Sequence, residues 1–131
     1  MDSQTQTDKL AILTGPPSDE YPDLISQTIE TLQTKATEKK RLILTTLEFE
    51  IWWAKIYTEA ERNLEKQLGR TPTLSAIEYY AITTHETEYR SRKMNIAHMQ
   101  HRIEDLDGIC QALQLRRDYL MSKAADTRAG V

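Results

Sequence analysis

The sequence predicts an all-α fold, an elongated antiparallel helical hairpin with a short helix at its tip, coiled-coil-like and expected to oligomerise. Its 131 residues suit a single domain, and four glycines and four prolines are few for the tight turns of a sheet protein. Apolar residues recur every three or four positions through two long segments. Residues 42–57 also carry more apolar surface than one partner helix can cover, which favours self-association.

Residues 1–22 are predicted to be a disordered acidic tail, because Gly15, Pro16 and Pro17 interrupt any helix. Such a tail either keeps the chain soluble or serves as a partner-binding or autoinhibitory arm. Its first ten residues do not look like a signal peptide, and the lone Cys110 fits a reducing compartment. A cytoplasmic location is therefore expected, and no segment is apolar enough to predict a membrane span.

Residues 23–124 are predicted to form the helical domain, and Asp23 is a plausible N-cap for its first long helix. Gly69 is suited to end this helix. Apolar residues follow one another along it at spacings of three and four, and this stripe contains Ile25, Ile29, Leu32, Ala36, Ile43, Leu47, Ile51, Ala54, Leu64 and Leu68. Because Leu44, Phe49, Trp52 and Ile56 lie off the stripe, the helix is expected to be apolar on more than one face. Thr34 and Thr37 weaken the pattern, so a break near residues 34–40 remains open.

A turn at residues 70–72 leads into a short tip helix, which Thr73 can cap, with Ser75 as an alternative cap. Residues 83–85 predict a second corner, with Thr84 capping the helix that follows.

The last helix is predicted from about Glu86 to Ala124, with residues 125–131 frayed. It shows a heptad repeat whose one charged core position is Arg117. The residues expected to hold the assembly together are Trp52, Trp53, Ile96, Met99, Ile103, Leu106, Leu113 and Leu120.

The sequence contains no motif typical of an enzyme active site, since it lacks a glycine-rich phosphate loop, a nucleophile motif and a cysteine pair with zinc spacing. His98 and His101 occupy outward heptad positions, and Cys110 occupies a core position. We therefore expect a non-enzymatic protein that needs no cofactor and no metal.

The sequence contains two basic clusters. One lies towards the end of the first helix and comprises Lys55, Arg62, Lys66 and Arg70, and the other lies at the start of the last helix and comprises Arg90, Arg92 and Lys93. A hairpin would bring both to one end of the molecule, where copies in an oligomer could attract a phosphate backbone. Tyr79, Tyr80 and Tyr89 are close in sequence and could stack on unpaired bases. The alternative is that these clusters are solvated helix faces balanced by neighbouring glutamates.

Two segments resemble the phage UvsY-type recombination mediators over roughly residues 45–124. One is AERNLEKQLGR at residues 60–70, where basic residues lead into a glycine. The other is CQALQLRR at residues 110–117, where a cysteine, an Ala-Leu pair and basic residues follow in similar order. The resemblance implies a small helical protein that oligomerises, binds single-stranded DNA and helps load a recombinase in place of a single-strand-binding protein.

The resemblance further implies that Arg62, Lys66 and Arg70 contact DNA and that the last helix carries self-association. A phage-encoded protein of this kind would act in the host cytoplasm. Glu61 and Glu65 depart from a cleanly basic stretch, and the acidic tail is an addition. The alternative function is a helical oligomeric adaptor or phage assembly chaperone that binds a protein partner through its heptad face.

Overall fold

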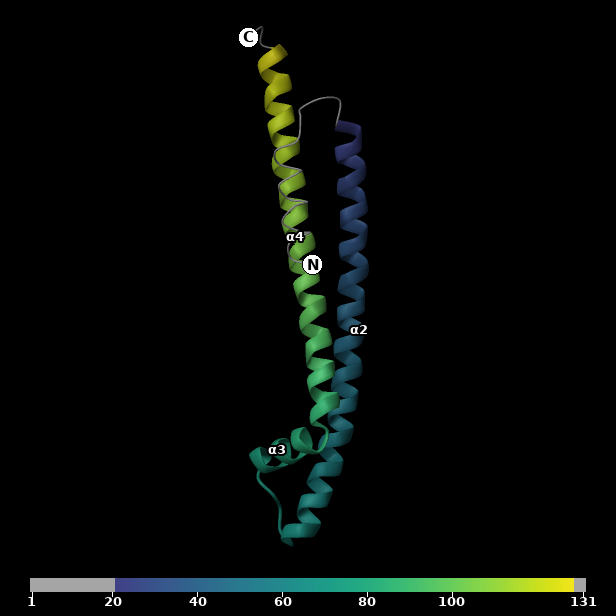
Figure 1. Ribbon diagram of the computed structural model, residues 1–131, viewed down its shortest axis with the longest axis vertical. Helices are drawn as coiled ribbons and strands as arrows, with labels where there is room; N and C mark the ends of the chain where they lie inside the picture. The colour runs from purple at the N-terminus through teal and green to yellow at the C-terminus, as the bar shows by residue number, and fades with distance from the viewer. Residues whose placement is uncertain (1–20, 129–131) are drawn as a thin grey trace. The chain divides into compact units, whose positions relative to one another are not determined.

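The computed structural model describes residues 21–128 of the chain. Within this range the protein consists of three helices, α2 (Tyr21–Leu68), α3 (Leu74–Thr84) and α4 (Glu86–Arg128), and contains no strand (Figure 1). The all-α prediction is therefore confirmed. None of these helices has a stretch long and apolar enough to cross a bilayer.

Helix α2 is continuous, so the break left open near residues 34–40 does not occur. Threonine hydroxyls in its first half donate hydrogen bonds to backbone carbonyl oxygens four residues earlier. These bonds satisfy the hydroxyl groups while the backbone stays helical. The pairs are Thr28 with Leu24, Thr31 with Gln27, Thr34 with Glu30 and Thr37 with Gln33.

Both ends of the predicted domain differ from the structure. Helix α2 begins at Tyr21, before the predicted cap Asp23, because proline is tolerated in the first turn of a helix. Helix α4 continues to Arg128 instead of ending at Ala124, since no helix breaker occurs before Gly130. The rest of the predicted acidic tail and residues 129–131 lie outside the described residues.

The connection between α2 and α3 follows its local sequence. Gly69 has φ of 67° and donates its backbone N–H to the Glu65 carbonyl oxygen at 2.8 Å, as expected for a residue that ends a helix. The Thr73 hydroxyl accepts a hydrogen bond from the backbone N–H of Ala76 at 3.2 Å, so Thr73 is the N-cap of α3. Both predictions are confirmed.

The second corner is tighter than predicted. Thr84 is the last residue of α3 and does not cap the next helix, because α4 starts at Glu86. His85 alone separates the two helices. Its backbone N–H donates to the Ala81 carbonyl oxygen at 3.2 Å, and its own carbonyl oxygen accepts from the Tyr89 N–H at 2.8 Å.

The chain divides into two compact units. In the described part, the first unit contains residues 21–39 of α2 and residues 101–128 of α4. The second unit contains residues 40–100, which include the rest of both long helices and the whole of α3.

The second unit has a small core in which α3 packs on α2. Ile56 and Ala60 of α2 are buried together with Ile77 and Ala81 of α3. The two alanines allow close approach of the helices, because they place little more than a methyl group between the backbones. Half-buried side chains surround this core, and they are Trp52, Trp53, Tyr57, Leu64 and Tyr80.

An aromatic cluster joins α2 to α4 in the second unit. The Phe49 ring lies 5.9 Å from the Tyr89 ring, and the Trp52 ring lies 6.1 Å from that of His85. Lys93 places its ammonium 4.8 Å from the centroid of the Phe49 ring. Phe49 and Trp52 of α2 therefore lie against residues 85–93, at the start of α4 and immediately before it.

In the first unit, ion pairs connect α2 to α4. The Lys35 ammonium pairs with the Asp107 carboxylate, and an Arg102 guanidinium nitrogen lies 3.6 Å from a carboxylate oxygen of the buried Glu38. The paired positions rise from 35 to 38 in α2 while they fall from 107 to 102 in α4. The buried apolar side chains here are Leu24, Ile103, Leu106, Ala112 and Leu113.

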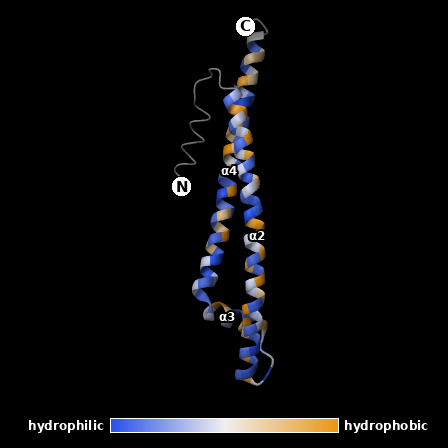
Figure 2. Cartoon of the chain, turned by 90° about the vertical axis from the view of Figure 1, so that its right-hand side faces the viewer, coloured by the Kyte–Doolittle hydropathy of each residue, from blue (hydrophilic) through white to orange (hydrophobic). Residues whose placement is uncertain are grey.

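Most of the regularly spaced apolar stripe of α2 is exposed. Figure 2 shows apolar residues, in orange, recurring along this helix. The exposed members are Ile25, Ile29, Leu32 and Ala36 in the first unit and Ile43, Leu47, Ile51, Ala54 and Leu68 in the second. Helix α2 is thus apolar on more than one side, as the sequence predicts. The side with Leu24, Ile56 and Ala60 takes the buried positions, and in the regularly spaced stripe Leu64 is half-buried.

Candidate nucleic-acid interface

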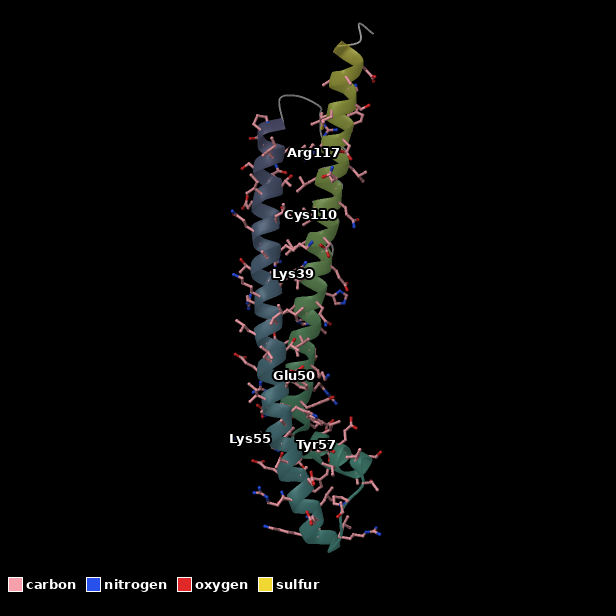
Figure 3. The ribbon with its side chains drawn as sticks, turned by 180° about the vertical axis from the view of Figure 1, so that it is seen from behind. Lys39, Glu50, Lys55, Tyr57, Cys110 and Arg117 are labelled. Atoms are coloured by element: carbon pink, nitrogen blue, oxygen red, sulfur yellow. The ribbon has the colours of Figure 1, made fainter. Side chains whose placement is uncertain are left out.

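The last turns of α2 present a basic face to solvent. Lys55, Arg62 and Lys66 are seven and four residues apart, so they lie on one face of the helix. Ile56 and Ala60, which are buried under α3, lie on the opposite face. Figure 3 shows Lys55 on the side of α2 away from α3 and Tyr57 on the side towards it. All three basic side chains are exposed.

These basic groups are not neutralised by a bound carboxylate. Within residues 21–128, the structure records no ion pair for Lys55, Arg62, Lys66 or Arg70. Glu59, four residues after Lys55 and three before Arg62, lies within this face, while Glu61 and Glu65 lie on the neighbouring face, and all three glutamates are exposed. The basic face therefore keeps its charge available for an anion, at a potential reduced by the adjacent glutamates.

The basic cluster on α4 has a different environment. A guanidinium nitrogen of Arg90 lies 2.9 Å from a Glu86 carboxylate oxygen, and a guanidinium nitrogen of Arg92 lies 3.1 Å from one of Glu88. Both are pairs four residues apart on one helix, a geometry that Glu86 and Glu88 make available. Neither arginine is as available to a phosphate as the basic residues of α2.

Two cations of this cluster also lie on aromatic faces. The Arg92 guanidinium carbon is 4.8 Å from the centroid of the Trp52 ring, and the Lys93 ammonium is 4.8 Å from that of Phe49. Such contacts stabilise the folded chain by about 0.5–1 kcal/mol at exposed sites. Arg92 and Lys93 therefore help to pack α4 on α2.

The structure separates the seven predicted DNA-contacting residues into two groups. Arg92 and Lys93 contact α2 at Trp52 and Phe49. Arg62 follows Trp52 by ten residues, which corresponds to about 15 Å along a helix at 1.5 Å per residue. Lys55 follows Trp52 by only three residues, so the two clusters adjoin at Lys55 and diverge towards Arg62. The exposed group on α2 is the stronger candidate for an anion.

The three tyrosines considered for base stacking differ in exposure. Tyr89 packs against the rings of Phe49 and Trp53, and Tyr80 is half-buried against the core of the second unit. Tyr79 is 72% exposed on α3. Only Tyr79 among the three offers a largely open ring.

The residues predicted to hold an oligomer together are mostly packed within the single chain. Met99, Ile103, Leu106 and Leu113 are buried, and the remaining members are half-buried, namely Trp52, Trp53, Ile96 and Leu120. The heptad face of α4 is therefore largely covered within the single chain. Self-association through an apolar surface would therefore need a surface other than the heptad face of α4.

The predicted charged core position was displaced by one residue. Arg117 is exposed, whereas Arg116 is 5% exposed, with its guanidinium carbon 5.4 Å from the centroid of the Tyr119 ring. The buried position that follows Leu113 is Arg116, three residues later, whereas the heptad repeat predicts Arg117, four residues later. The burial of Ala112 beside Leu113 marks this shift, and an unbroken heptad reading of the sequence missed it.

The residues that could bind a metal do not cluster in the described part of the chain. Residues 21–128 contain no group of three or more metal-ligating side chains, and His98 and His101 are both exposed as predicted. Cys110 is half-buried in the first unit. Comparison of the chain with protein-family models, curated proteins and solved structures finds no match.

Proposed function

We propose that this chain is a non-enzymatic recombination mediator that binds single-stranded DNA and helps to load a recombinase in place of a single-strand-binding protein. The observation that carries the proposal is the exposed basic face of α2, with Lys55, Arg62 and Lys66 aligned and Arg70 following the helix end. Because this face is opposite the buried side of α2, a strand can approach it without unpacking the core.

The geometry suits contact with phosphates more than recognition of bases. Arg62 and Lys66 are one helical turn apart, about 6 Å along the axis. Charged groups at such spacing fix a strand through its backbone, which carries no sequence information. Tyr79, exposed on α3, supplies a ring on which an unpaired base can stack, and such stacking is tolerant of sequence. Binding without sequence preference is what a mediator requires.

The proposal includes the finer architecture expected from the sequence. The order of the ion pairs between α2 and α4 in the first unit supports an antiparallel helical hairpin. Oligomerisation would repeat the basic face and so strengthen a modest site by avidity. In this arrangement the assembled protein grips phosphates and presents the strand to a recombinase filament.

The direct experiment is fluorescence anisotropy of a labelled single-stranded oligonucleotide titrated with the protein at several salt concentrations. Three or four phosphate contacts per subunit should give a slope of log K against log salt of about −2 to −3, from about −0.7 per contact on single strands. Arg62→Gln/Lys66→Gln should weaken binding and flatten this slope.

A matched control is Lys39→Gln/Arg117→Gln, which removes the same charge from two other exposed positions, labelled in Figure 3. This control should bind as the wild type does. Mediator activity is then tested by recombinase loading onto strands coated with single-strand-binding protein. Oligomeric protein that fails to bind the oligonucleotide at low salt would contradict the proposal and leave an adaptor or assembly chaperone with a protein partner.

A further inference from the structure

The second unit carries an apolar surface that its own chain leaves open. Four large side chains of α2 make up this outer face, with exposed fractions of 61% for Ile43, 60% for Leu44, 49% for Leu47 and 72% for Ile51. Ile43, Leu47 and Ile51 follow one another at intervals of four, and Leu44 adjoins Ile43 and Leu47, so all four lie in one continuous stripe. Contiguous exposed apolar surface of this kind marks an interaction site.

Charged residues lie along the outer face, basic ones at its beginning and acidic ones further along α2. Lys40 and Arg41 stand at its beginning, and Glu48 and Glu50 stand further along, and all four are exposed. The face is therefore basic at one end and acidic at the other. A second copy of the same face, turned end for end, would complement it at both ends.

We propose that two copies of this chain associate through the outer faces of α2, packed antiparallel. In this arrangement the basic residues Lys40 and Arg41 of one copy lie beside the acidic residues Glu48 and Glu50 of the other, and the two-fold symmetry repeats the contact. With the axis near residues 44 and 45, Ile43 of each copy faces Leu47 of the other. A parallel, in-register pair would instead place Lys40 next to its own equivalent.

The contact is isologous, and it uses none of the side chains that close the core of the second unit. Ile56, Ala60, Ile77 and Ala81 stay in place, so each protomer keeps its fold on association. A typical stable interface buries about 1,200–2,000 Å² in total. One helix face supplies only part of such an area, and the dimer should consequently depend on protein concentration.

Sedimentation velocity across a concentration series tests the surface. The wild type should sediment above the 15.2 kDa monomer at high concentration, and Ile43→Glu/Leu47→Glu should raise the dissociation constant at least about tenfold, the effect of 1.4 kcal/mol. Glutamate is a better helix former than isoleucine, so circular dichroism should show unchanged helicity. The control Leu74→Glu/Tyr79→Glu changes two exposed apolar residues of α3 and should leave the association unaltered.

A wild type that stays monomeric at its highest soluble concentration would overturn the proposal. So would a face variant that associates as the wild type does, or a control that loses association equally. Because these measurements contain no DNA, their outcome is independent of the proposed strand binding.

Disulfide trapping tests the antiparallel orientation. Cys110 is the single cysteine, so Cys110→Ser gives a background without thiols. Ile43→Cys and Leu47→Cys are placed on separate protein preparations in this background and mixed under mild oxidation. The antiparallel contact should favour the mixed 43–47 disulfide over the like-with-like products, whereas a predominance of 43–43 and 47–47 disulfides would show a parallel pair and refute the orientation.

Discussion

The Arg92 guanidinium carbon lies 4.8 Å from the centroid of the Trp52 ring while the same side chain donates two hydrogen bonds to one Glu88 carboxylate oxygen, at 3.2 and 3.1 Å. Arg92 is thus held from α4 by a glutamate of its own helix and covers an aromatic face of α2. This relationship gives a basic residue a packing role in the second unit.

Replacing Arg92 by glutamine should lower the free energy of unfolding by about 0.8–1.5 kcal/mol, because both the contact with the Trp52 ring and the ion pair with Glu88 are lost. Urea unfolding followed by tryptophan fluorescence measures the change. Glu88→Gln is the control, since it removes only an exposed ion pair worth about 0.3–0.5 kcal/mol. If both variants lose the same free energy, the ring contact contributes nothing.

Ile77→Ala should destabilise the chain by about 2–5 kcal/mol, because it opens a cavity where α3 packs on α2. Ile77 is 2% exposed, whereas Leu74 in the same helix is 75% exposed. Leu74→Ala should therefore change the free energy of unfolding by no more than about 0.5 kcal/mol. Chemical denaturation compares the two variants, and equal losses would show that α3 is not anchored by Ile77.

Gly69→Ala should cost about 1–2 kcal/mol of stability, since a residue with a Cβ is strained at φ of 67°. No atom lies within 4 Å of the position that a Cβ would take, so the cost is conformational rather than steric. Gly69→Asn should lose less, because asparagine tolerates the left-handed region. Thermal unfolding of both variants tests whether Gly69→Asn is the more stable of the two. A steric clash of the larger asparagine side chain would make it the less stable one.

The pair of Lys35 and Asp107 should make stability depend on pH. Hydrogen bonding from the Lys35 ammonium lowers the pKa of Asp107 below 3.8, and the same bond raises the pKa of Lys35 above 10.5. The Asp107 contribution is complete above pH 3.8 and is lost as the pH falls through the lowered pKa. The Lys35 contribution is complete below pH 10.5 and is lost as the pH rises through the raised pKa.

Asp107→Asn should accordingly unfold at a lower temperature than the wild type at neutral pH, and the difference should shrink at a pH well below 3.8. Thermal melts at both pH values provide the measurement. Lys35→Met/Asp107→Asn should lose less than the sum of the single variants, as expected for directly interacting partners. A difference that is constant with pH would exclude the ion pair as its cause.

Features that depend on local chemistry were predictable from the sequence. Gly69 and Thr73 act within one or two turns of their own position, so the helix end and the cap could be assigned without tertiary structure. The alignment of Lys55, Arg62 and Lys66 on one face of α2 likewise follows from their spacing along the helix. Predicting these features required only the helical repeat and the local preferences of glycine and threonine at helix ends.

Choices between competing surfaces were not predictable in the same way. Two sides of α2 are apolar, and the series with Ile43 and Leu47 has the more regular spacing, yet the side with Ile56 is buried. The inward side carries Lys35 and Glu38, which are acceptable there because Asp107 and Arg102 on α4 pair with them. No periodicity along a single helix contains that information about its partner.

The division of the chain also sets an order for folding. The first unit draws its two helical segments from opposite ends of the chain and contains no turn that joins them, because every residue between them belongs to the second unit. Bringing such distant segments together from the unfolded chain carries a larger entropy cost than closing the short turns at Gly69 and His85. The second unit should therefore nucleate folding, and the pairing of residues 21–39 with residues 101–128 should form after it.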